Sequence, residues 1–161
     1  MRRFEKISFE QFKKDIKDDK ELYDNYKLPE RKTKCSAGYD FLAIEGFEIA
    51  PGEIKKIPTG IKALYPDDEA LMLYVRSSMG FKWNVRLCNQ VGVIDADYYN
   101  NPDNEGHMWL ALQNHGDKTF KVEKGQGFGQ GIFMKYYTVD NENKIENERT
   151  GAFGSTNEEG K

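Results

Sequence analysis

The stretch VRLCNQVGVID, residues 85–95, is one of several short β-like runs between residues 39 and 139. The others are YDFLAIEGFEIA, EIKKIPTGIKALY, EALMLYVRSS, MWLALQN and GFGQGIFMKYYTV. Turn-forming residues lie between the runs in the segments APGE, YPDDE, NNPDNEG and NHGDK. Many short strands with no helix between them are typical of an antiparallel barrel. The sequence therefore predicts an all-β fold, a jelly-roll-like antiparallel barrel.

The two ends of the chain have different patterns. RRFEKIS predicts a short strand, and apolar residues at helical spacing predict one helix over about residues 8–27. Ser8 followed by Gln11 has the spacing of a capping box, and Pro29 ends the helix. From residue 140 the chain is polar and glycine-rich. We expect one domain over residues 1–139, which includes the helical insertion, and a mobile tail over residues 140–161.

The composition argues against several classes of function. The net charge of the 161 residues is −3 and no basic block is present, so nucleic acid is not an expected partner. Cys35 and Cys88 match no metal spacing and no disulfide framework, which favours a reducing compartment. No segment approaches the roughly 20 apolar residues of a membrane helix. We expect a cytoplasmic protein with no membrane partner.

Two aspartates, Asp95 and Asp97, follow the apolar run VGVI. In a strand they would point to the same face, because side chains alternate with a period of two. Taken alone, such a pair is usually a cap on a turn. Carboxylates at the end of an apolar run can also be there for chemistry, since buried carboxylates need a partner or a use.

Two further stretches carry groups that suit a phosphate chain. YVRSSMGF ends a strand with an arginine and two serines, which can donate hydrogen bonds to phosphate oxygens. ERTGAFGST combines an arginine, glycines, hydroxyls and the lone Phe153, whose ring suits stacking on a base. The alternatives are an ordinary strand-to-turn transition and a flexible end. His107 and His115 lack ligand-like spacing and are interpreted as surface or packing residues.

Five stretches, taken in order, resemble the trimeric dUTP diphosphatase (dUTPase) family. They are AGYDFLA, RSSMG, NQVGVIDADYYN, GQGFGQGIF and RTGAFGST, and the likeness covers roughly residues 30–156. The long YYNNPDNEGH segment is similar to forms from Gram-positive bacteria and their phages. The resemblance implies a homotrimer, with active sites shared between subunits, that hydrolyses dUTP to dUMP and pyrophosphate with Mg²⁺ on the triphosphate. Such an enzyme keeps uracil out of DNA and supplies dUMP for thymidylate synthesis.

The resemblance also implies a role for each matching residue. Asp95 would be the catalytic carboxylate that activates the attacking water, and Asp40 would hold a water ligand of Mg²⁺ in the outer shell. Asn89 and Gly92 would lie on a hairpin that binds the uracil edge, and Tyr98 under the deoxyribose. The implied phosphate contacts are Arg76, Ser77, Ser78 and Gln130 from the barrel and Arg149, Ser155 and Thr156 from the tail. Phe153 would stack over uracil.

Departures from the family pattern and alternative functions both bear on these expectations. Ser78 stands where the family commonly has glycine, and the fifth motif is one residue shorter between Arg149 and Phe153 than its commonest form. A dCTP deaminase shares the architecture, but its chemistry needs a carboxylate base where this chain has Asn89 and Gln90. The third alternative is a phage-type dUTPase with an added regulatory protein partner.

Overall fold

A computed structural model describes residues 1–145, 149 and 151 of the chain. The strands are β1 Arg3–Lys6, β2 Tyr39–Leu42, β3 Phe47–Ile49, β4 Ile54–Pro58, β5 Ile61–Leu64, β6 Glu69–Tyr74, β7 Val85–Leu87, β8 Gly92–Asp95, β9 Trp109–Asn114, β10 Phe120–Val122 and β11 Gly127–Lys135. The α helices are α1 Phe9–Asp15, α2 Lys20–Asn25 and α3 Ser77–Trp83, and η1, Ala96–Tyr98, is a 3-10 turn. None of the described helices is long and apolar enough to cross a bilayer.

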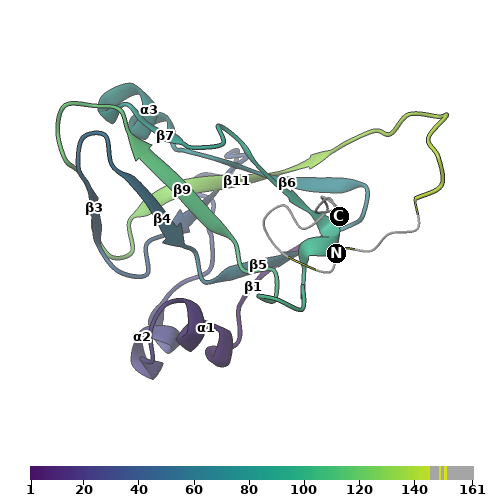
Figure 1. The fold of residues 1–161 in the computed structure, drawn as a ribbon, viewed down its shortest axis with the longest axis horizontal. Helices are drawn as coiled ribbons and strands as arrows, with labels where there is room; N and C mark the ends of the chain where they lie inside the picture. Colours follow the sequence, from purple (N-terminus) through teal and green to yellow (C-terminus); the bar gives the residue numbers. More distant parts are fainter. Residues whose placement is uncertain (146–148, 150, 152–161) are drawn as a thin grey trace, which may run out of the picture.

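All strand pairings among the described residues are antiparallel, which confirms the predicted fold class. The largest sheet has the order β2-β11-β6-β8, and a three-stranded sheet has the order β4-β9-β7. Two further strand pairs are β1-β5 and β10-β3, and Figure 1 labels β1, β5 and β3. After β11 the described chain runs away from the sheets, as the yellow segment of Figure 1 shows.

The core lies between the two larger sheets and follows the alternation of their strands. In β9, Leu110 and Leu112 are fully buried while Trp109 and Ala111 are only partly buried. Burial of each such leucine contributes about 1.5–3 kcal/mol. A β-carbon added to Gly129 of β11 would lie 2.3 Å from Leu110 Cδ2, so glycine permits the close contact between these sheets.

The segment over residues 8–27 forms two helices, and the prediction of a single helix is wrong. Ser8 caps α1 as predicted, since its hydroxyl accepts from the Gln11 backbone N–H at 3.1 Å. Asp19 starts a second helix because its carboxylate accepts from the Leu22 N–H at 2.9 Å. The rings of Phe12 and Tyr26 stack at 5.5 Å between the two helices. Figure 1 shows the pair below β1 and β5.

Helix α3 contradicts the prediction that no helix separates the strands. It begins directly after Arg76 and ends at Trp83, and the capping residue Asn84 adopts a left-handed conformation with φ of 54°. Met79 is the buried residue of this seven-residue helix. With one buried position, the sequence shows no helical periodicity that could be recognised.

Candidate active site

Cross-strand neighbours bring the first group of predicted site residues together. Gln130 of β11 lies opposite Asp40 of β2 on one side and opposite Tyr74 of β6 on the other. Arg76, Ser77 and Ser78 follow β6 after one intervening residue, Val75. Together with part of the loop before β2 they line a pocket of about 370 Å³, here called the sheet pocket. Its lining residues are Lys32, Ser36, Gly38, Asp40, Arg76, Ser77, Ser78 and Gln130.

An arginine and a buried carboxylate face each other in the sheet pocket. Arg76 Nε lies 3.4 Å from Asp40 Oδ1, and Arg76 Nη1 donates to the Gly127 carbonyl at 3.4 Å. Asp40 is 6% exposed, and its Oδ2 is buried with no hydrogen-bond partner among the described residues. Because such an oxygen is costly to leave unpaired, the site is suited to a bound donor such as a water molecule.

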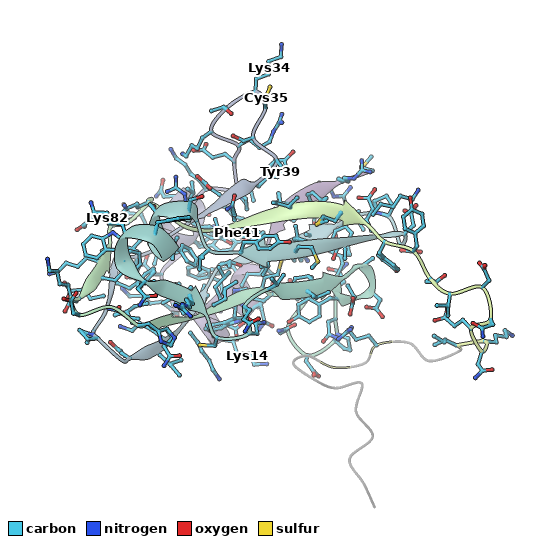
Figure 2. The ribbon with its side chains drawn as sticks, turned by 90° about the horizontal axis from the view of Figure 1, so that it is seen from above. Lys14, Lys34, Cys35, Tyr39, Phe41 and Lys82 are labelled. Carbon is cyan, nitrogen blue, oxygen red and sulfur yellow. The ribbon has the colours of Figure 1, made fainter. Side chains whose placement is uncertain are left out.

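The loop before β2 supplies the remaining wall of the sheet pocket. Figure 2 shows Lys34 and Cys35 projecting beyond the sheets, with Tyr39 at the base of the loop. Lys32 and Ser36 line the pocket from this loop and are not predicted from the sequence. A β-carbon added to Gly38 would lie 2.2 Å from Gln130 Oε1, so a side chain at residue 38 would displace Gln130.

Asp95 lies in a different place, at the last residue of β8, where it pairs with Ala70 of β6. The chain turns into η1 immediately after it, so the aspartates do not lie on one continuous strand. Tyr65 donates from its hydroxyl to the Ile94 carbonyl at 2.6 Å, which fixes the end of the strand. A pocket of about 160 Å³, here called the carboxylate pocket, lies beside it. Its lining residues are Val93, Ile94, Asp95, Tyr98, Met108, Trp109 and Arg149.

One guanidinium bridges the two aspartates. Arg149 donates from Nη2 to Asp95 Oδ2 at 2.5 Å and from Nε to Asp97 Oδ1 at 3.0 Å. The two carboxylates are half-exposed, whereas the arginine side chain is mostly buried. Asp97 therefore pairs with the tail arginine, where the sequence alone favours a turn cap. Phe153, Ser155 and Thr156, the other predicted tail residues, lie outside the described residues.

Tyr98 forms a wall of the carboxylate pocket and is held by its hydroxyl. The hydroxyl donates to the His107 carbonyl at 3.1 Å and accepts from Asn104 Nδ2 at 2.8 Å. Burial raises the pKa of Tyr98, so the phenol is neutral at physiological pH. The residue is 7% exposed. Because its hydroxyl is hydrogen-bonded within the protein, the ring is the part that faces the pocket.

Asn89 and Gly92 line a third pocket of about 490 Å³, here called the apolar pocket. Its lining residues are Lys56, Leu73, Leu87, Cys88, Asn89, Gly92, Trp109 and Ala111. The predicted hairpin is a connection between sheets, because β7 pairs with β9 and β8 pairs with β6. A β-carbon on Gly92 would lie 3.0 Å from Leu73 Cβ, so the close approach of β8 to β6 favours glycine.

Trp109 lines both the carboxylate pocket and the apolar pocket, although no motif in the sequence marks it as a site residue. The alternation of leucines with other residues along β9 could have indicated which face of the sheet Trp109 lies on. With Leu110 and Leu112 in the core, Trp109 must point to the outer face of the sheet. A partly buried aromatic ring on an outer face is characteristic of a binding surface.

A hollow of about 500 Å³ between the end of α3 and the turn after β9 contains none of the predicted site residues. Among the described residues, no group of three or more His, Cys, Asp or Glu side chains could hold a metal ion.

Similarity to known proteins agrees with this arrangement. The dUTPase family model matches residues 24–157. The chain is 52% identical over 130 residues to the deoxyuridine 5′-triphosphate nucleotidohydrolase of Lactococcus lactis, covering 80% of this chain and 87% of the relative. The corresponding protein of Actinobacillus succinogenes is 37% identical over 143 residues, covering 84% of this chain and 91% of the relative.

Solved dUTPase structures also match the chain. The crystal structure of dUTPase from Streptococcus mutans superposes with a TM-score of 0.69 at 40% identity, covering 86% of this chain and 98% of that one. A dUTPase from phage phi11 of S. aureus, described with a structural Mg(II) ion, has a TM-score of 0.65. The match covers 91% of this chain and 97% of the phage protein, and at 18% identity the likeness shows the fold alone. The chain belongs to the dUTPase family.

Proposed function

We propose that this protein hydrolyses dUTP to dUMP and pyrophosphate by attack of water on the α-phosphorus. The observation that carries the proposal is the carboxylate pocket. Its acid, Asp95, is half-exposed at the end of a strand and lies beside the rings of Tyr98 and Trp109. The relatives named deoxyuridine 5′-triphosphate nucleotidohydrolases support the choice of substrate.

In this mechanism Asp95 orients a water molecule and accepts its proton as the oxygen bonds to the α-phosphorus. The bond from that phosphorus to the bridging oxygen breaks, and the electron pair leaves with pyrophosphate. Positioned general-base help of this kind is worth about 10²–10⁴-fold in rate. Arg149, which contacts Asp95 here, can exchange the carboxylate for phosphate oxygens when a nucleotide arrives.

The sheet pocket suits the phosphate chain and its magnesium ion. Arg76, Ser77, Ser78 and Gln130 provide donors for phosphate oxygens. The unpaired Oδ2 of Asp40 fits a water molecule on Mg²⁺, an ion that keeps several of its waters. Bound to the triphosphate, Mg²⁺ would neutralise charge that develops on the leaving pyrophosphate.

We further propose a homotrimer in which different subunits supply the two pockets. Asp95 pairs with Ala70 at the start of β6, while Arg76 follows the other end of that strand. Six residues of extended chain span about 20 Å. A water beside Asp95 must reach the α-phosphorus at about 3 Å, so this separation supports an acid and phosphate donors that come from different subunits.

Base and sugar would be bound around Trp109. Asn89 and the backbone near Gly92 can hydrogen-bond the uracil edge, and the Tyr98 ring can lie under the deoxyribose. In the tail, Ser155 and Thr156 would join Arg149 on the γ-phosphate, and Phe153 would stack over uracil. These tail roles stay predictions, as do the cytoplasmic location and the regulatory protein partner.

The direct test is pyrophosphate release from dUTP, dTTP, dCTP and UTP with Mg²⁺ and with EDTA. We expect turnover of dUTP well above that of the others, and loss of turnover in EDTA. Equal turnover of all four nucleotides would contradict the proposal. Ammonia release from dCTP would favour the deaminase. A protein partner captured equally by wild type and Asp95→Asn would establish a regulatory role independent of catalysis.

A further inference from the structure

The segment over residues 99–107, here called the 99–107 loop, closes on itself beside Tyr98. The Asn100 N–H donates to the Glu105 carbonyl at 3.0 Å, and the Glu105 N–H donates to the Asn101 carbonyl at 2.7 Å. Gly106 has a φ of 80°, and a β-carbon there would lie 2.3 Å from the Tyr98 carbonyl oxygen. The loop is therefore packed directly onto the backbone of the residue that it follows.

Asn104 connects this loop to the tip of the Tyr98 ring. Its amide nitrogen donates to the Tyr98 hydroxyl at 2.8 Å and to the His107 carbonyl at 3.5 Å. Its amide oxygen accepts from the Gly106 N–H at 3.1 Å. The side chain is almost fully buried, so its hydrogen bonds are not exchanged for bonds to bulk water. The Tyr98 hydroxyl is thus fixed by a donor and an acceptor that both belong to the loop.

Helix α1 holds the same loop from the outside, at both ends of the helix. At its start, Ser8 donates from its backbone N–H to Glu105 Oε2 at 3.0 Å, and the Ser8 hydroxyl also bonds this carboxylate. At its end, Asp15 Oδ2 lies 2.6 Å from Nδ1 of the fully buried His107. Glu105 and His107 flank Gly106, so α1 contacts the loop on both sides of its tightest point.

Charge and burial support a rigid attachment. Partial burial acts to raise the pKa of Glu105, but hydrogen bonds from Ser8 and Lys62 outweigh it, and the pKa lies below its usual value. The Lys62 ammonium lies 3.2 Å from Glu105 Oε2 and donates to Asn100 Oδ1 at 2.8 Å. Strand β5, which carries Lys62, therefore holds the loop as well.

We propose that Asn104 is a positioning residue that fixes the Tyr98 ring, and that α1 serves to hold the 99–107 loop in place for this purpose. The inference rests on the proposed function, in which the Tyr98 ring lies against the deoxyribose. Discrimination of dUTP from UTP then depends on Asn104 and on α1, although neither contacts the nucleotide. Helix α1 of the helical insertion thus contributes to the selectivity for deoxyribose over ribose.

The first test compares Asn104→Leu with wild type. Leucine has a similar volume but neither donates nor accepts, so the Tyr98 hydroxyl loses its bond to residue 104. One such bond is worth about 0.5–1.5 kcal/mol, so we expect the ratio of kcat/KM for dUTP to that for UTP to fall about 2- to 10-fold. We expect kcat for dUTP to stay close to wild type. On a Tyr98→Phe background the same substitution should add little. An unchanged ratio, or an equal further fall on that background, would overturn the proposal.

A second test addresses the helix with a matched pair of variants. Asp15→Ala removes the partner of His107, while Asp24→Ala on α2 removes a carboxylate that pairs with the exposed Lys20. We expect only Asp15→Ala to lower selectivity between dUTP and UTP. If both variants keep the wild-type ratio, the contact of α1 with His107 has no part in sugar selectivity.

A measurement without turnover separates this inference from the proposed function. NMR of selectively ¹³C-labelled tyrosine reports the flip rate of the Tyr98 ring in the free protein. We expect faster flipping in Asn104→Leu than in wild type, and an unchanged rate would overturn the inference. Absence of dUTP hydrolysis by wild type would instead refute the proposed function, while the ring-flip rate still decides whether Asn104 holds Tyr98.

Discussion

The sheet pocket and the carboxylate pocket are held together by different means. In the sheet pocket, Asp40 and Gln130 are direct cross-strand neighbours, so their placement follows from the register of β2 and β11. In the carboxylate pocket, Tyr98 is fixed by a loop, and Asp95 is bonded to an arginine 54 positions away. In the first pocket, strand register places the acid and the glutamine, and the loop before β2 adds one wall. The second depends on segments outside the barrel, and this dependence gives other parts of the chain a way to influence catalysis.

The sharpest test of the carboxylate pocket is Asp95→Asn, with Asp97→Asn as its matched control. Both aspartates bond Arg149, but only Asp95 lines the pocket. We expect kcat for dUTP to fall about 10²–10⁴-fold in Asp95→Asn, because the general base is lost. Asp97→Asn should stay within about tenfold of wild type, since it loses a single exposed ion pair. Equal losses in the two variants would show that the pair acts only through Arg149.

Removing the tail tests how far the carboxylate pocket depends on segments outside the barrel. Truncation after residue 147 eliminates Arg149 and the rest of the fifth motif. Hydrogen bonds to charged groups are worth about 1.5–3 kcal/mol, so we expect kcat/KM for dUTP to fall about 10- to 100-fold. Circular dichroism and the oligomeric state should match those of the full chain. Unchanged turnover would show that the tail takes no part.

The sheet pocket is tested by two glycine substitutions. Gly38→Ala would place a methyl group 2.2 Å from Gln130 Oε1, whereas a β-carbon at Gly80 of α3 meets nothing within 4 Å. We expect Gly38→Ala to raise KM for dUTP and to lower the free energy of unfolding by about 0.5–1.5 kcal/mol, because Gln130 would lose its hydrogen bond to the Val75 carbonyl. Gly80→Ala should stabilise the protein by about 0.5–1 kcal/mol, since alanine favours a helix. Denaturant unfolding measures both changes, and equal effects would mean that Gln130 moves freely.

The smallest expected effect is a pH dependence at His107, which joins α1 to the 99–107 loop. Burial lowers the pKa of His107, although Asp15 and Glu105 act to raise it, and Nε2 accepts from the Gly60 N–H at 2.9 Å. The unfolded chain therefore binds the proton more readily than the folded one. The contribution of His107 to the free energy of unfolding is complete above about pH 6.5. It is lost as the pH drops toward the folded pKa, and the loss is about 1.4 kcal/mol for each pH unit that separates the unfolded and folded pKa values.

Urea unfolding between pH 7.5 and pH 5 measures this slope. His107→Gln should show a weaker dependence over the same range, because its side chain does not titrate. A wild-type slope that survives in the variant would assign the effect to other groups.

The sequence predicts the barrel better than the connections between its strands. Strands such as β6 and β9 are visible as apolar runs between turn residues. Helix α3 is not, because one buried methionine gives no periodicity. The break between α1 and α2 depends on the cap at Asp19, inside a polar stretch that reads equally well as helix.

In the candidate site, too, contacts between distant segments are harder to predict from the sequence than contacts within the barrel. Asp40, Arg76 and Gln130 come together in the sheet pocket, while their roles toward phosphate and Mg²⁺ stay predictions. The Arg149 pair with Asp95 and Asp97 joins segments that are distant in sequence, and no local pattern encodes it. The contact of α1 with Glu105 and His107 is likewise a tertiary effect. Sequence alone leaves both the helix and the 99–107 loop without a role.

The separation of about 20 Å along β6 between Asp95 and Arg76 has a consequence for mixed assemblies. If each reaction centre takes its acid from one copy and its phosphate donors from another, no copy is active or inactive by itself. A copy that lacks the acid still supplies phosphate donors to a neighbour's centre. A copy that lacks the arginine still supplies its acid to another centre. Two inert variants combined in one particle would therefore regenerate some intact centres.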